Sequence, residues 1–383
     1  MATSNMENRA TLRDLFRFFF TLGVTAFGGP VAHLAIMQRE AVEKRGWMSK
    51  NEFLDVIGLL NLIPGPNSTQ MTMYFGFRHG GIPGMLVAGL SFIVPAAAIT
   101  LVLAWVYVTY GALPEAQAVM WGIQPVVIGV IAAAMWRLVP QAIGSWVSRI
   151  FFAAAILAAL LGVSEFVIIL GGGAVAWAWF TWTKPRFSSG TTSVWPWSLT
   201  FLTGLGATAQ AAGIAAADVF WVFVRMALVL YGSGYLLVAY MQADLVDRLG
   251  WLTMQQMLDV LAIGQMTPGP FLTTATAAGM VIAGFPGALA ATVGIFLPSF
   301  FLIGLLGGRV QALRESTWGK HFLLGVNAAV VAVLLIVSLR FAAGIGFDPV
   351  RLGLIAITLL ALEKWKINSM LLLCMGALVG LLA

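Results

Sequence analysis

Two copies of the tripeptide Pro-Gly-Pro are the features of this sequence best suited to chemistry. They comprise Pro64, Gly65, Pro66, Pro268, Gly269 and Pro270. Proline has no amide donor and its ring clashes with the preceding helical turn, whereas it is favoured in the first turn of a new helix. Each copy therefore predicts that one helix ends and another begins.

The residues after each copy give the new helix a polar first turn. They are Asn67, Ser68, Thr69 and Gln70 after the first copy, and Thr273 and Thr274, preceded by Phe271 and Leu272, after the second. A helix start presents unpaired amide donors and about half a positive charge, which an anion can satisfy. If both starts met inside a membrane, they could hold one oxyanion from two sides. The alternative is a plain surface turn with a solvated cap.

Glycine-rich breaks precede both motifs and add further candidate site residues. The candidates are Gly28 and Gly29, from Phe-Gly-Gly-Pro, and Gly232 and Ser233, from Tyr-Gly-Ser-Gly. Glycine allows a ligand to approach the backbone closely, although helix packing or a simple kink explains these residues equally well. His33 follows the first break and is either a proton-sensitive site residue or a histidine held by ordinary hydrogen bonds.

Other kinds of chemistry find little support in the sequence. The single cysteine, Cys374, cannot form an intrachain disulfide, and the three histidines lack the spacing of metal ligands. Neither a phosphate-binding loop nor a zinc-protease motif is present. We therefore expect no metal, no cofactor and no enzymatic activity.

The elements that position these residues are predicted to be membrane helices. The 383 residues are 60% hydrophobic and 9% charged, whereas soluble domains carry about 25% charged residues. Apolar runs of spanning or near-spanning length cover residues 15–27, 85–107, 118–136, 150–182, 199–212, 219–240, 289–306, 322–341, 352–362 and 370–383. The run 150–182 is too long for one span, and Gly162-Val163-Ser164-Glu165 predicts a hairpin within it.

The charge distribution suits the same interpretation. The net charge of +6 fits the lysines and arginines of cytoplasmic loops better than nucleic-acid binding, which we do not expect. Arg9, Arg13 and Arg17 favour a cytoplasmic N-terminus, and no removable signal peptide is recognisable.

The two Pro-Gly-Pro copies belong to an internal repeat with an offset of about 204 residues. Gly46-Trp47 matches Gly250-Trp251, and, after one deletion, Pro95 matches Pro298 and Gly122 matches Gly325. We expect an N-terminal repeat (1–183), a polar linker (184–198), a connecting apolar segment (199–212) and a C-terminal repeat (219–383). One spare segment between the halves favours inverted-topology repeats with broken or re-entrant helices, although a parallel arrangement stays open.

Each half is also expected to contain a capped helix before the Pro-Gly-Pro motif. The capping pairs are Ser49 with Glu52 and Thr253 with Gln256. Asp55 and Asp259 are repeat mates on these helices and serve as structural anchors or as proton relays. Arg225 lies in an apolar run close to Asp218, which indicates a position at the membrane interface or beside a polar pathway.

These motifs together resemble the long, two-domain form of the chromate ion transporter family. The resemblance rests on Phe27-Gly28-Gly29-Pro30-Val31-Ala32-His33, Gly46-Trp47 and Pro64-Gly65-Pro66 with Thr69-Gln70, and it covers nearly the whole chain. The second half departs from the family pattern, because Leu237 stands where His33 is expected and Thr274 replaces Gln70. The two halves are therefore expected to be unequal at the site.

The resemblance implies a multi-pass protein of the inner membrane that exports chromate, a divalent oxyanion, and confers chromate resistance. The alternative is a proton-coupled importer or exchanger of sulfate or a similar oxyanion. The expected partners are the small oxyanion substrate and the lipid bilayer, and a homodimer is possible. A membrane enzyme would need a buried catalytic cluster, and the sequence contains none.

Overall fold

Broken helices in two homologous halves build the protein. The computed structural model describes residues 9–61, 63–183, 213–231, 234–307, 317–346 and 348–383. The first half contains α1 (Leu12–Thr25), α2 (Gly29–Met37), the π-helix η1 (Gln38–Lys44), α3 (Lys50–Leu60), α4 (Asn67–Tyr110), α5 (Pro114–Ala142), α6 (Trp146–Leu160) and α7 (Glu165–Thr183). The second half contains α8 (Ala216–Val229), α9 (Leu236–Met241), the π-helix η3 (Gln242–Arg248), α10 (Met254–Met266), the 3-10 turn η4 (Phe271–Thr273), α11 (Thr274–Leu306), α13 (Thr317–Gly344), α14 (Pro349–Glu363) and α15 (Ser369–Leu382).

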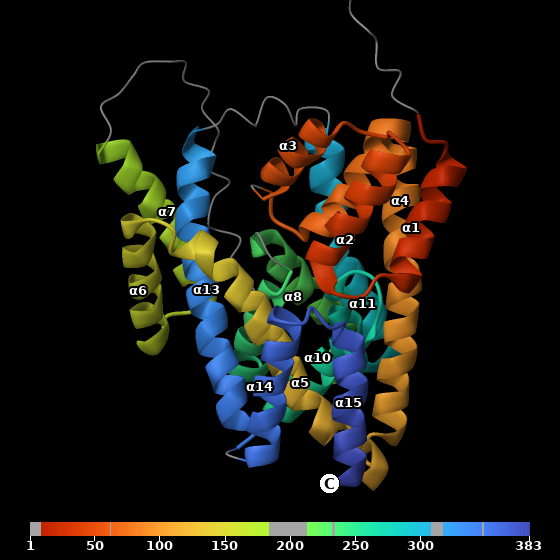
Figure 1. Cartoon of the computed structure of the whole chain (residues 1–383), viewed down its shortest axis with the longest axis vertical. Coiled ribbons are helices and arrows are strands. Elements are labelled where there is room, and N and C mark those ends of the chain that lie inside the picture. The colour runs from red at the N-terminus through yellow and green to blue at the C-terminus, as the bar shows by residue number, and fades with distance from the viewer. Residues whose placement is uncertain (1–8, 62, 184–212, 232–233, 308–316, 347) are drawn as a thin grey trace, which may run out of the picture.

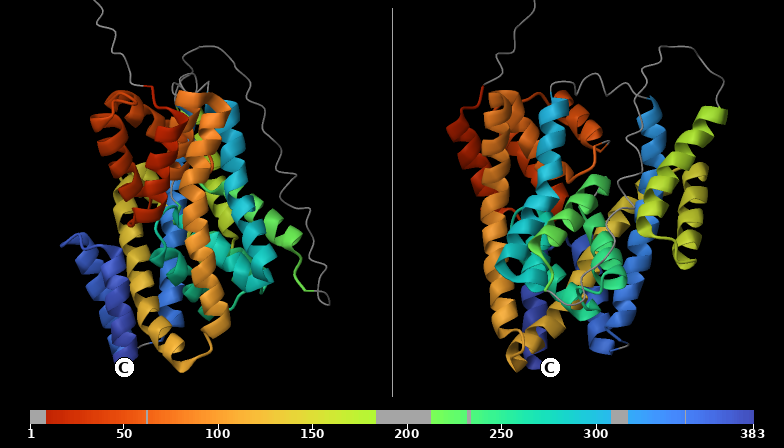
Figure 2. Two further views of the ribbon diagram at one scale, coloured as in Figure 1. Left: turned by 90° about the vertical axis from the view of Figure 1, so that its right-hand side faces the viewer. Right: turned by 180° about the vertical axis from the view of Figure 1, so that it is seen from behind.

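The two halves run in opposite directions through the molecule. Figures 1 and 2 show the long part of α4 descending to the lower end, where α5 begins, whereas α11 ends and α13 begins at the upper end. The hairpin α6–α7 lies in the upper part and its mate α14–α15 in the lower part. The halves are therefore inverted repeats, as the spare connecting segment predicted.

Matching kinks confirm that the repeat extends to the backbone. α4 is interrupted at Gly80 and Gly81, and α11 is interrupted at Ala283 and Gly284, with nearly equal dihedral angles in each pair. Gly81 and Gly284 have φ values of +60° and +64°, a left-handed conformation that glycine adopts without steric cost. Each long helix is thus two helices joined at a sharp glycine break.

The helical hairpin at the end of each half packs against a membrane-spanning helix of the other half. α6 and α7 contact α13, whereas α14 and α15 contact α5. The crossings are close because glycines face each other: a Cβ at Gly122 would lie 2.0 Å from the carbonyl oxygen of Gly376, and one at Gly325 would lie 2.1 Å from that of Gly172. Small residues that let helix backbones approach are typical of membrane helix pairs.

The outer surface is suited to lipid. Five helices among the described residues, α4, α5, α7, α11 and α13, are long and apolar enough to cross a membrane. Large apolar side chains such as Val102, Leu157, Trp179 and Phe301 are more than half exposed, as expected for lipid-facing positions. The chain is a multi-pass membrane protein.

The π-helices η1 and η3 repeat one charge pattern outside these spanning helices. Lys44 donates to Glu40 at 2.8 Å, and Arg248 donates to Asp244 at 2.7 Å, in the same i,i+4 relation. The hydrogen bond from Lys44 lowers the pKa of the Glu40 carboxyl, so this pair stays ionised. The repeat therefore preserves an ion pair although every residue in it differs.

Some sequence expectations need correction or lie outside the described residues. The apolar run 219–240 is not one helix, because α8 ends at Val229 and α9 begins at Leu236. Arg78 lies in the last turn before the α4 kink and donates to Glu52 at 2.8 Å. Glu52 therefore does not close the expected capping box, although Ser49 caps the helix start. The linker 184–198 and the segment 199–212 lie outside the described residues.

The close helix crossings give a first prediction, for Gly325→Val and its repeat mate Gly122→Val. Each new side chain collides with a facing backbone carbonyl, so each change is expected to destabilise the fold by about 1–3 kcal/mol. The measurement is thermal unfolding in detergent. Gly353→Val is the matched control, because a Cβ at this helical glycine meets no atom within 4 Å. Equal destabilisation by all three changes would contradict the prediction.

Candidate functional site

Both Pro-Gly-Pro motifs join two helices in the interior, as predicted. Pro66 is the N-cap of α4 and Pro270 is the N-cap of η4, which leads into α11. Gly65 and Gly269 have φ values of +132° and +87°, so the central glycine supplies the left-handed turn that lets the chain change direction. Neither motif is a surface turn, because the residues that follow both are buried.

Each motif is hydrogen-bonded to the opposite half. The amide of Gly65 donates to the carbonyl of Leu230, just after α8, at 2.6 Å, and the amide of Gly269 donates to the carbonyl of Ala26, just after α1, at 2.9 Å. The surroundings are mirrored as well: a Cβ at Gly65 would lie 2.6 Å from the Ser299 hydroxyl, and one at Gly269 would lie 2.6 Å from the Ala96 side chain. The two breaks are therefore locked together by reciprocal backbone bonds.

The start of α4 offers unpaired donors in a buried setting. The first intrahelical bond of α4 runs from the Gln70 amide to the Pro66 carbonyl, and no side chain caps the helix start. The amides of Ser68 and Thr69 therefore have no partner within the helix. All four residues from Asn67 to Gln70 are at most 9% exposed.

The polar side chains of this first turn are only partly satisfied. Asn67 donates through Nδ2 to Asn61 Oδ1 at 2.5 Å, and Gln70 donates through Nε2 to the Pro64 carbonyl at 2.7 Å. The hydroxyls of Thr69 and Ser299 are buried and have no hydrogen-bond partner in the part of the chain that the structure describes. Buried polar atoms normally find a partner, so these two hydroxyls are available to a ligand.

His33 connects α2 to the same helix start. Its Nε2 lies 3.3 Å from the Ala26 carbonyl and its Nδ1 lies 3.5 Å from the Ser68 hydroxyl, in a fully buried position. A carbonyl only accepts hydrogen bonds, so Nε2 carries the proton in the neutral ring and Nδ1 accepts from Ser68. Since Ala26 also accepts from Gly269, His33 joins the α4 start to the break in the second half.

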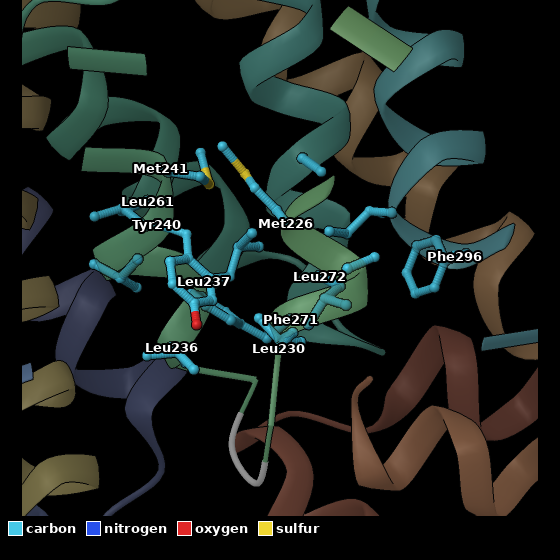
Figure 3. Close-up of a cluster of buried hydrophobic side chains, with 14 of the residues drawn as sticks. Met226, Leu230, Leu236, Leu237, Tyr240, Met241, Leu261, Phe271, Leu272 and Phe296 are labelled. Carbon is cyan, nitrogen blue, oxygen red and sulfur yellow. The ribbon is translucent and has the colours of Figure 1, made fainter. Parts of the chain in front are cut away.

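The start of the second-half helix is different. Thr273 and Thr274 donate their hydroxyls back to the carbonyls of Pro270 and Phe271, at 3.0 and 2.7 Å. Figure 3 shows the surroundings as an apolar cluster that includes Leu230, Leu236, Leu237, Tyr240, Phe271 and Leu272. Among the described residues, the hydroxyl of Thr69 is thus unsatisfied whereas the hydroxyl of its repeat mate Thr273 is bonded to its own backbone, in keeping with the expected inequality of the halves.

The glycine break before α2 lies next to the second half. Gly28 and Gly29 both have positive φ, and a Cβ at Gly29 would lie 2.9 Å from the Tyr235 hydroxyl at the start of α9. Close packing between the halves therefore requires glycine at this position. The candidates Gly232 and Ser233 lie outside the described residues.

Sequence reasoning missed several polar residues that the fold brings in. Ser299 was overlooked although it follows Pro298, the repeat mate of Pro95, and this repeat position was a usable signal. Asp259 is buried and accepts from Tyr107 at 2.8 Å and from Gln124 at 2.7 Å, and Arg351 donates to Gln124 at 2.6 Å. Asp259 thus links α10 to α4 and α5 directly and to α14 through Gln124, which favours the anchor interpretation, although no basic residue of the described part of the chain forms an ion pair with it.

No group of three or more histidine, cysteine or acidic side chains with metal-binding geometry occurs among the residues that the structure describes. The donors at the α4 start are backbone amides and hydroxyls, which suit an oxyanion rather than a cation.

The repeat supplies a matched test of His33. His33→Leu gives the first half the residue that the second half carries at Leu237, so the chain is expected to fold with a loss of about 1–3 kcal/mol for the broken hydrogen bonds. The reverse change, Leu237→His, places an imidazole in a fully buried apolar cluster and is expected to cost more. Thermal unfolding in detergent measures both, and a larger loss for His33→Leu would contradict this prediction.

Comparison with known proteins agrees with the repeat and the broken helices. The profile of the family described as Chromate transporter matches twice, at residues 13–177 and 217–381. A probable chromate transport protein of Synechococcus elongatus is 30% identical over 370 residues, which cover 94% of this chain and 92% of the relative. A chromate transport protein of Cupriavidus metallidurans is 28% identical over 378 residues, with 97% and 93% coverage.

A third relative, a chromate transport protein of Pseudomonas aeruginosa, is 31% identical over 332 residues, which cover 84% of this chain and 79% of the relative. No solved structure matches the chain. The relatives are transport proteins rather than enzymes, and the double match to the family profile covers both halves. This chain belongs to the chromate transporter family.

Proposed function

We propose that this protein is a secondary transporter that exports chromate across the inner membrane and thereby gives chromate resistance. The observation that carries the proposal is the buried, uncapped start of α4, where the backbone amides of Ser68 and Thr69 lack a helical partner and the Thr69 hydroxyl is unsatisfied among the described residues. The names of the relatives supply the substrate.

The buried start of α4 is energetically unfavourable when no ligand satisfies its donors. A helix start buried in a membrane protein leaves donors that water cannot reach, and each unsatisfied donor is costly. An oxyanion returns hydrogen bonds to several donors at once and is attracted by the positive end of the helix dipole. Chromate has four oxygens, so it could bond to the amides and to the Thr69 and Ser299 hydroxyls together.

The protonation state of His33 is proposed to control whether the Ser68 hydroxyl can donate to the anion. In the neutral ring Nδ1 accepts a hydrogen bond from the Ser68 hydroxyl, so the Ser68 proton is not offered to the anion. Protonation of His33 would release Ser68 and add a positive charge beside the helix start. The second candidate function, a proton-coupled importer or exchanger of sulfate or a similar oxyanion, would require this protonation.

The membrane potential suffices to drive export of a dianion. Moving one charge is worth about 2.3 kcal/mol per 100 mV, so an inside-negative potential of that size favours the exit of a dianion by roughly 4.6 kcal/mol. At about 1.4 kcal/mol per tenfold, this sustains a concentration ratio of about three decades. Export therefore needs no partner ion, whereas uptake against the potential does.

Thr69 and its repeat mate Thr273 provide the test of the site. Thr69→Val removes a free buried hydroxyl, and a hydrogen bond to a charged group is worth about 1.5–3 kcal/mol, so half-saturation by chromate should rise by about tenfold or more. Thr273→Val removes a hydroxyl that already donates to Pro270 and should leave affinity nearly unchanged. Equilibrium binding of radiolabelled chromate to purified protein measures both, and Thr69→Ser is the rescue control. Equal effects of the two valine changes on chromate affinity would contradict the assignment of Thr69 to the site.

Flux in proteoliposomes with a clamped potential tests the mechanism. Uncoupled export predicts that chromate leaves vesicles faster when the interior is negative and more slowly when the sign is reversed. Flux that ignores the potential, depends on pH and carries sulfate equally well would favour the exchanger instead. The homodimer expected from the sequence stays a prediction.

A further inference from the structure

The segment between the two breaks of each half packs differently in the two halves. The first inner segment comprises α2, η1 and α3, and the second inner segment, its repeat mate, comprises α9, η3 and α10. In the first, α2 and α3 pack on α4 of their own half. In the second, α9 packs on α13 and α7, and α10 packs on α5, α4 and α15. The second inner segment is therefore docked against both halves.

The first inner segment is not docked in the equivalent way. The mate of the α10–α5 contact would be a contact of α3 with α13, and no comparable packing of these two helices occurs among the described residues. Figure 1 shows α3 standing apart from α13 and α7 at the upper end of the molecule. The two halves thus share one set of elements but differ in how the inner segment is placed.

Equivalent residues of the two inner segments differ in exposure. Leu54 on α3 is 51% exposed, whereas its mate Leu258 on α10 is 2% exposed. Ala35 on α2 is exposed, whereas its mate Ala239 on α9 is fully buried. The first inner segment therefore leaves open the helix faces that its mate packs against protein.

An ion pair changes partners between the halves. Asp247 of η3 pairs with Arg340 of α13 at 3.4 Å. Their repeat mates are Glu43 of η1 and Arg137 of α5. Arg137 instead donates to Glu363, at the end of α14, at 2.8 Å. The first half therefore contains both residues of the equivalent ion pair, but its arginine is engaged by a different carboxylate.

A further ion pair holds only the second inner segment in place. Asp244 of η3 has a side chain that is 3% exposed, and it accepts from Arg225 of α8 at 2.5 Å. The repeat mates are Glu40 of η1 and Thr21 of α1, and the Thr21 hydroxyl donates to the Arg17 carbonyl of its own helix at 2.8 Å. An uncharged threonine cannot form the ion pair, so the second inner segment is the more firmly held of the two.

We propose that the first inner segment is a gate, open in this structure, which closes by adopting the placement of its mate. On closure α2 leaves α4 and packs on α5 and α15, α3 docks on α13 and α7, and Arg137 exchanges Glu363 for Glu43. The backbone bonds of Gly65 and Gly269 are already alike in the two halves, so the centre stays fixed while the gate moves. The proposal rests on the proposed transport function, which such a movement would serve.

Thiol labelling of the full chain in lipid nanodiscs tests whether the gate is open to water. The background is Cys374→Ser, which removes the single cysteine, and Leu54→Cys and Leu258→Cys are introduced separately. A charged maleimide reacts with thiols that water reaches, so Leu54→Cys is expected to label about tenfold faster than Leu258→Cys. Labelling of Leu54→Cys no faster than that of Leu258→Cys would overturn the proposal, because the face would then be docked or covered by lipid.

A crosslink reports the closed gate directly. In the docked second inner segment, Tyr240 stacks on Phe166 of α7 with ring centres 4.4 Å apart, and the repeat mates of these residues are Ile36 and Met370. Ile36→Cys combined with Met370→Cys, in the cysteine-free background, is expected to react with a short bifunctional thiol reagent each time the gate closes. Failure of this pair to crosslink would overturn the proposal.

Two conservative changes should shift the crosslinking rate in opposite directions. Glu43→Gln removes the ion pair of the closed gate and should slow crosslinking by about two- to fivefold, whereas Glu363→Gln releases Arg137 and should speed it by a similar factor. Glu115→Gln removes an exposed acid at the start of α5 and is the matched control, which should leave the rate unchanged. Shifts of Glu43→Gln and Glu363→Gln in the same direction, or no shift in either, would overturn the proposed exchange of partners.

These measurements use no chromate and therefore separate the gate from the transport proposal. Crosslinking as expected in a protein that moves no chromate would contradict the proposed function and leave the gate supported. Chromate flux that continues at the full rate after the gate has been crosslinked shut would overturn the gate and leave the proposed function supported.

Discussion

The structure depends on how broken helices are satisfied inside a membrane. A break exposes amide donors where water cannot reach them, and an open break would destabilise the fold. Here each central glycine donates to the opposite half, Gly65 to Leu230 and Gly269 to Ala26. Gly29 lets the halves approach each other closely, because a Cβ at this position would lie 2.9 Å from the Tyr235 hydroxyl of the other half. Because each half supplies the acceptor that the other half needs, neither half completes its own break.

The sequence was sufficient for features that depend on one residue type at one place. Proline ends a helix wherever it stands, so both breaks, the inverted halves and the hairpin at residues 162–165 could be predicted from composition and spacing. Which helices and side chains contact each other could not be predicted, because one apolar helix face can pack against many other apolar faces. Nothing local indicates that α6 and α7 pack on α13, or that Arg225 pairs with Asp244 rather than the nearby Asp218. The hydroxyls of Thr273 and Thr274 were likewise ambiguous, since a single rotamer decides whether they face a ligand or their own backbone.

The repeat preserves a backbone while its side chains diverge. The kinks of α4 and α11 have nearly the same angles, and the ion pair of η1 recurs in η3 with different residues. The two helix starts differ, because His33 faces Ser68 in one half and Leu237 lies in an apolar cluster in the other. A symmetric scaffold supplies two equivalent conformations for alternating access. In the proposed mechanism, an asymmetric centre would confine the anion to one place, so that a single substrate would move in each cycle.

The first turn of α4, from Asn67 to Gln70, carries no lysine or arginine. The absence of a buried cation there bears on how readily the proposed site could release an anion. A buried guanidinium would bind a dianion strongly and would itself be costly to leave unpaired when the anion departs. At the proposed site, amides and hydroxyls would hold the anion with bonds that water can replace once the site opens. The positive partial charge of the helix start is balanced by the negative partial charge at the other end of the helix. A carrier must release its substrate as readily as it binds it. A site built from neutral donors meets that requirement, and the driving force can then come from the membrane potential rather than from binding energy.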